Sequence, residues 1–91
     1  MTDDSAEPRP PLRIELPIGS EEDLRALRGA LVAARATELS EVQRRAGRHS
    51  YGYGSDSARE TMSEEVATHR RRHDLLDRLL AAIDEATARD R

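Results

Sequence analysis

The feature that most constrains this chain is a long apolar stripe at helical spacing, which runs from Ser57 to about Ala88. At about 100° per residue, the apolar side chains of this stretch fall on one face of a single helix. His69 and His73 interrupt the stripe halfway along, and such a polar pair is the place where we expect any chemistry of this helix. The stripe consists of Ala58, Met62, Val66, His69, His73, Leu76, Leu80 and Ile83, and Leu79 widens it.

A second helical pattern covers residues 20–46. Ser20 is its predicted N-cap, because the serine hydroxyl can accept a hydrogen bond from the free backbone N–H of Asp23. The acidic residues that follow Ser20 suit the positive end of the helix dipole. Gly47 marks the predicted end, since glycine is common just beyond a helix C-terminus. One broad arc of this helix is apolar and contains Leu24, Leu27, Leu31, Val32, Leu39, Val42 and Ala46.

The remaining segments offer few side chains to bury. Residues 1–11 are acidic and rich in proline, and we expect them to form a disordered tail. Residues 12–18 alternate apolar and charged side chains next to proline, which predicts a short extended segment or strand. Residues 47–56 are rich in glycine and serine and predict a loop. Residues 19–91 should therefore form a helical hairpin, whose second helix covers about 57–89.

These elements predict an all-α fold, an antiparallel two-helix hairpin preceded by a short extended segment. Two helices cannot wrap each other, so each apolar stripe keeps an uncovered flank. We therefore expect two hairpins to pair as a homodimer in a four-helix bundle. Matching the two stripes residue by residue sets Val42 against Met62 and places Arg35 opposite His69.

Composition narrows the classes of function. Cysteine is absent, which excludes disulfide and thiolate chemistry. No run approaches about 18 apolar residues and the N-terminus has no apolar signal core, so we expect a cytoplasmic protein without membrane association. The net charge of −3 argues against nucleic-acid binding. The arginines near residues 44–48 and 70–72 keep a DNA-associated regulator as an alternative, although acidic neighbours favour a salt-bridged surface.

The matched stripes also bring interior polar residues to one level of the hairpin. His69 and His73 are four residues apart and could share a metal ion, but Arg70 follows His69, which excludes the H-E-x-x-H pattern of zinc proteases. A polar layer that fixes the helix register is the favoured interpretation. A metal site and an anion site remain alternatives, and we assign no metal ion and no cofactor. The predicted layer consists of Arg35, Glu38, Glu65, His69 and His73.

The predicted loop contains both tyrosines of the chain. His49, Tyr51 and Tyr53 lie among glycines, as in loops that contact partners. No nucleophile with an adjacent base and no phosphate-binding loop is recognisable, so catalysis has no positive support. We therefore expect a non-enzymatic interaction or regulatory module that binds a protein partner through this loop or through the extended segment. The alternative is a small-molecule or metal-binding protein, with an enzyme included in this class, that uses the polar layer.

Overall fold

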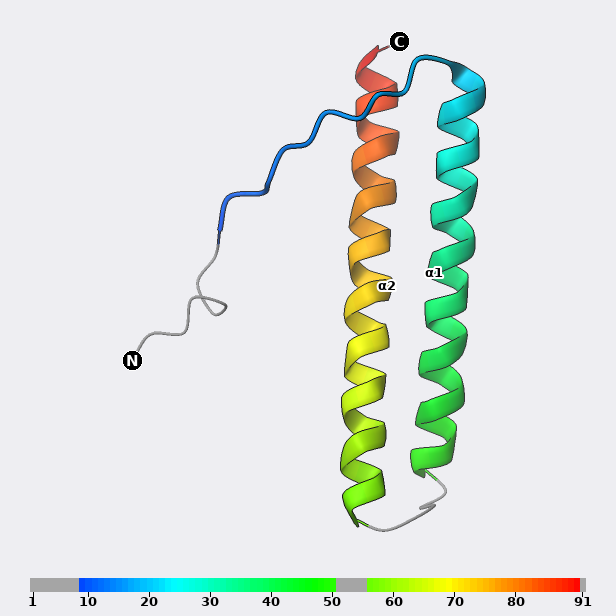
Figure 1. Cartoon of the computed structure of the whole chain (residues 1–91), viewed down its shortest axis with the longest axis vertical. Coiled ribbons are helices and arrows are strands. Elements are labelled where there is room, and N and C mark those ends of the chain that lie inside the picture. Colours follow the sequence, from blue (N-terminus) through cyan, green and yellow to red (C-terminus); the bar gives the residue numbers. More distant parts are fainter. Residues whose placement is uncertain (1–8, 51–55, 91) are drawn as a thin grey trace.

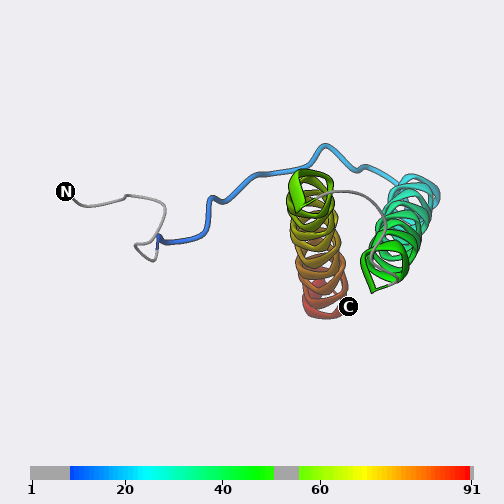
Figure 2. The same cartoon turned by 90° about the horizontal axis from the view of Figure 1, so that it is seen from below.

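The computed structural model describes residues 9–50 and 56–90 and consists of two helices, α1 (Glu21–Ser50) and α2 (Asp56–Asp90). The helices lie side by side and run in opposite directions along most of their length (Figure 1), and the view along their axes shows the same pairing (Figure 2). The described residues contain no strand. The predicted all-helical hairpin is therefore confirmed. In the described part of the chain, no helix has an apolar stretch long enough to cross a membrane.

The start of α1 follows directly from the sequence. The backbone N–H of Asp23 donates to the Ser20 side-chain oxygen at 3.0 Å, and the N–H of Leu24 donates to the Ser20 carbonyl at 3.1 Å. Glu21, Glu22 and Asp23 occupy the first turn, where negative charge interacts favourably with the helix dipole. The predicted N-cap is confirmed.

The end of α1 differs from the prediction, because the helix continues through Gly47 to Ser50. Glycine within a helix costs only about 1 kcal/mol relative to alanine, which a helix of 30 residues tolerates. A Cβ atom placed on Gly47 would meet nothing within 4 Å, so no close approach requires a glycine here. The prediction that Gly47 ends the helix was wrong, and α2 begins at Asp56, at the end of the predicted loop.

Residues 9–19 form neither helix nor strand and lead away from the N-terminal end of α1, past the end of α2 (Figure 1). The side chains of residues 9–17 are exposed, and that of Ile18 is half-buried. The N–H of Ile18 donates to the carbonyl of Leu16 at 2.8 Å, which tightens the chain just before the helix. The segment thus presents its apolar side chains to solvent.

The core between α1 and α2 is thin. Among the described residues, Val42 and Leu80 are the buried apolar side chains, at 8% and 2% exposure. Three leucines on the helices, Leu39, Leu75 and Leu79, stay 44%, 48% and 42% exposed. A single hairpin therefore covers only part of the apolar surface that its helices carry.

The two helices are displaced along each other relative to the predicted register. Arg35 contacts Asp77 rather than lying opposite His69, and His69 contacts Glu38 instead. The partner of His69 is thus three residues further along α1 than predicted, a displacement of about one helical turn. The prediction of Arg35 opposite His69 was wrong.

Candidate functional site

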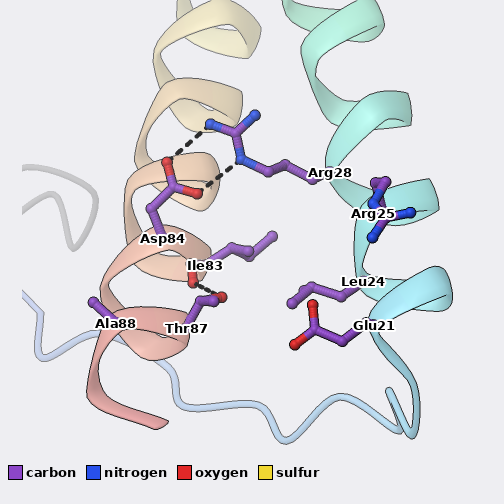
Figure 3. Close-up of a pocket in the computed structure, with 8 residues that line it drawn as sticks. All are labelled: Glu21, Leu24, Arg25, Arg28, Ile83, Asp84, Thr87 and Ala88. Carbon is purple, nitrogen blue, oxygen red and sulfur yellow. Dashed lines mark hydrogen bonds and ion pairs between the residues drawn. The ribbon is translucent and has the colours of Figure 1, made fainter. Parts of the chain in front are cut away.

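Two arginines of α1 reach across one side of the hairpin to aspartates of α2. Arg28 donates from Nε and Nη2 to both carboxylate oxygens of Asp84, at 2.8 and 3.0 Å (Figure 3). Arg35 donates from Nη1 to Asp77 at 2.6 Å. The hydrogen bonds between Arg28 and Asp84 lower the pKa of the Asp84 carboxyl group and raise the pKa of the Arg28 guanidinium. These pairs are partly solvent-exposed, so each adds little stability.

Glu38 and His69 form the most enclosed polar contact between the helices. The Nδ1 atom of His69 lies 2.5 Å from Oε1 of Glu38, and the two side chains are 17% and 18% exposed. Both residues come from the apolar faces of their helices, so the contact lies between the helices rather than at their rim. It is the part of the predicted polar layer that the structure brings together across the hairpin.

The other members of the predicted layer have separate partners. Glu65 accepts a hydrogen bond from Nε of Arg45 at 2.6 Å, and Arg45 also contacts Glu41 on its own helix. Hydrogen bonds from Arg44 and Arg45 lower the pKa of Glu41. The pKa of Arg45 is raised by its hydrogen bonds to Glu65 and Glu41.

The second histidine of the layer points to its own helix. His73 Nδ1 lies 3.1 Å from a carboxylate oxygen of the adjacent Asp74. Arg35, as described above, is paired with Asp77. The five predicted residues therefore form several small ion pairs and not one shared site. Within residues 9–50 and 56–90, no group of three or more histidine or acidic side chains is arranged to hold a metal ion.

A shallow hollow next to His69 contains two of the predicted residues, His69 and Glu65. Its charged walls are balanced, with two arginines against two glutamates, so its charge favours neither an anion nor a cation. The hollow therefore gives no support to the anion-binding alternative. Its lining is Arg45, Thr61, Glu64, Glu65, Thr68, His69 and Arg72.

A second hollow lies between the N-terminal end of α1 and the C-terminal end of α2 (Figure 3). No sequence pattern predicts this hollow, because it depends on which residues of the two helices stand at the same level. Leu24 and Ile83 line it, and the Arg28–Asp84 pair lies on one side of them (Figure 3). Its full lining is Glu21, Leu24, Arg25, Arg28, Ile83, Asp84, Thr87 and Ala88.

Two segments were predicted to contact a partner, the loop with both tyrosines and the N-terminal segment. Tyr51 and Tyr53 and the side chain of His49 lie outside the described residues. The N-terminal segment is described, and its three apolar residues Leu12, Ile14 and Leu16 are 85%, 70% and 49% exposed. They are the largest exposed apolar side chains outside the helices in the described part of the chain.

Comparisons of the chain with protein-family models, curated proteins and solved structures give no match.

Proposed function

We propose that this protein is a non-enzymatic interaction module that works as a homodimer and binds a protein partner through its N-terminal segment. The observation that carries the proposal is the exposure of Leu12, Ile14 and Leu16 ahead of the hairpin. Exposed apolar side chains that lie together are typical of binding surfaces, whereas single ones are common on any protein.

The spacing of these side chains suggests how the partner is bound. Leu12, Ile14 and Leu16 alternate with Arg13 and Glu15, so in an extended chain they point to one side and the charged residues to the other. Residues 12–15 make no backbone–backbone hydrogen bond with other described residues. A segment of this kind can join the edge of a partner's sheet, where its backbone supplies affinity and its apolar side chains fill pockets.

The test is site-specific photo-crosslinking in the cells that make the protein. A photoreactive amino acid replaces residues 12 to 16 one at a time, and the crosslinked products are identified by mass spectrometry. We expect Leu12, Ile14 and Leu16 to crosslink to the same protein, and Arg13 and Glu15 to give much less product, since one side of an added strand faces the partner.

Uniform crosslinking at all five positions, or none, would contradict the proposed docking of the segment. A matched pair of variants provides the control. Replacing the three apolar residues with serine should abolish binding to the crosslinked protein, whereas replacing Arg13 and Glu15 with serine should leave most of it.

Two further parts of the proposal come from the sequence and the thin core. Dimerisation into a four-helix bundle would cover Leu75 and Leu79, which one hairpin leaves exposed. A cytoplasmic location stays a prediction from the sequence. Ligand binding by the polar layer is disfavoured because its members are paired separately, as Arg35 is with Asp77 and Glu65 with Arg45.

A further inference from the structure

The hairpin has two sides that differ in chemistry. The pairs Arg28–Asp84 and Arg35–Asp77 bridge the helices on one of them, which we call the ion-pair side. At about 100° per residue, Leu79 points away from α1 and to the other flank of α2 from Asp77 and Asp84. We call this opposite surface the leucine side.

The leucine side is apolar between Asp23 at one end and Arg72 at the other, which lie close to the helical angles of Ala30 and Leu79. Leu75 and Leu79 are 48% and 42% exposed there. The charged residues of α2 at the same levels, such as Arg78 and Glu85, point to other angles around the helix. Four α2 residues and three α1 residues form this surface: Leu75, Leu79, Ala82, Ala86, Leu27, Ala30 and Ala34.

Large and small residues of this surface stand at matched levels. The four cross-helix contacts Glu38–His69, Arg45–Glu65, Arg35–Asp77 and Arg28–Asp84 set the relative height of α1 and α2 to within about one helical turn. In the middle of this range, each leucine of the surface is about level with an alanine of the other helix. The resulting pairs are Leu79 with Ala30, Leu75 with Ala34, and Leu27 with Ala82.

This pattern is self-complementary. We infer that a second copy of the chain docks on the leucine side, with a two-fold axis parallel to the helices, so that α2 of each copy packs against α1 of the other. The inference deepens the proposed dimer and rests on it. A leucine of one copy then fills the space above an alanine of the other, as in the interdigitated core of a helix bundle. All neighbouring helices are antiparallel in this arrangement.

The opposite orientation of the second copy is less favourable. If the second copy were reversed along the helix axis with the two hairpins fully overlapping, the apolar half of one hairpin would lie against Glu41, Arg45 and Glu65 of the other. Burying charged groups against leucine is costly. The ion-pair side is also a poorer interface, because docking there would desolvate Arg28 and Arg35 with their aspartates.

The surface of the isolated chain leaves room for such an interface. It exposes 7577 Å², whereas a compact monomer of this mass exposes about 5300 Å². The exposed residues 9–17 account for part of this difference. A stable dimer buries roughly 1200–2000 Å² in total, which is within the excess.

Sedimentation equilibrium of two matched variants tests the choice of side. Leu79→Glu introduces a charge on the leucine side, and Leu39→Glu introduces the same charge at nearly equal exposure on the other flank, 44% against 42%. We expect Leu79→Glu to raise the dimer Kd about 100-fold or more, because each dimer then buries two unpaired carboxylates. Leu39→Glu should change it by no more than about threefold.

A size exchange tests the pairing and does not depend on a disruptive charge. Leu79→Ala leaves a gap and Ala30→Leu creates a clash with Leu79 of the other copy, so each should weaken the dimer. The double variant Leu79→Ala with Ala30→Leu should restore the dimer Kd to within about threefold of wild type. Circular dichroism of each variant checks that the helices are intact.

The outcomes separate the two levels of the proposal. A wild-type chain that stays monomeric at all concentrations would refute the dimer itself. A wild-type dimer that Leu39→Glu dissociates and Leu79→Glu leaves intact would refute only the leucine side as interface. A double variant that is no tighter than the single ones would overturn the Leu79–Ala30 pairing.

Discussion

Replacing Leu80 with alanine should be the most destabilising leucine truncation in the helices. Leu80 is 2% exposed, the less exposed of the two buried apolar side chains among the described residues. Enclosed leucine-to-alanine substitutions cost about 3–5 kcal/mol, from lost burial and from the cavity left behind. The neighbours of Leu80 on this thin hairpin are only half-buried and can relax into the space, so we expect the lower end, about 3 kcal/mol.

Leu39→Ala is the matched control, because it makes the same chemical change in the other helix. Leu39 is 44% exposed, so truncation loses roughly half of a leucine's burial and leaves no closed cavity. We expect a cost of about 1 kcal/mol. A domain of this size has a total stability of only roughly 5–10 kcal/mol, so the two variants should be clearly separated.

The assay is urea unfolding followed by far-ultraviolet circular dichroism, with both variants at one protein concentration. The free energies of unfolding should differ by about 2 kcal/mol, with similar slopes against urea. Equal costs for Leu80→Ala and Leu39→Ala would mean that the helices do not pack through Leu80, and the reasoning about the core would be refuted.

Three other substitutions test separate parts of the structure by the same urea titration. Gly29→Ala should stabilise the chain by about 0.5–1 kcal/mol, since a Cβ there meets nothing within 4 Å, and a loss of stability would contradict an unstrained helix at this point. Arg28 lowers the pKa of Asp84, so this carboxylate stabilises the fold fully above the unfolded-state pKa of about 3.9 and loses its effect as pH falls through the lower folded-state value. The difference between wild type and Asp84→Asn should therefore shrink on acidification, and a difference independent of pH would contradict the pairing. A double-mutant cycle that replaces Glu38 and His69 with alanine should give a coupling of about 1 kcal/mol, whereas additive effects would mean that the two side chains do not interact.

The helices could be predicted from the sequence because their signals are local. The apolar stripe of α2 and the Ser20 cap of α1 each depend on residues within a few turns of one another. The end of α1 could not be predicted in this way. Gly47 is a common stop signal, but glycine also fits inside a helix at a cost of about 1 kcal/mol, and the local pattern does not decide between the two.

The register of the hairpin was harder to predict for a geometric reason. A slide of three or four residues returns an apolar stripe to within about 60° of its original direction, so two registers bury nearly the same faces. Long side chains then choose among several acids within reach. Arg35 pairs with Asp77, and His69 contacts Glu38. No periodicity in the sequence specifies either choice of partner.

The candidate site was predictable only in part for the same reason. The alternation of Leu12 and Ile14 in an extended segment was recognisable from spacing alone. Their exposure became known only from the structure. The polar layer depended on the register, and its members separated when the register moved by about one turn. The hollow at Leu24 and Ile83 depends on which ends of the helices are level and has no signal in either helix alone.

The central claim is that one hairpin is half of a folded unit and that a second copy completes its core. The most direct measurement is thermal unfolding of the wild-type chain by circular dichroism over a hundredfold range of protein concentration. If folding is coupled to dimerisation, the Tm should rise steadily with concentration, because association stabilises only the folded state. A Tm that does not change over this range, together with a monomer mass by sedimentation, would contradict the claim.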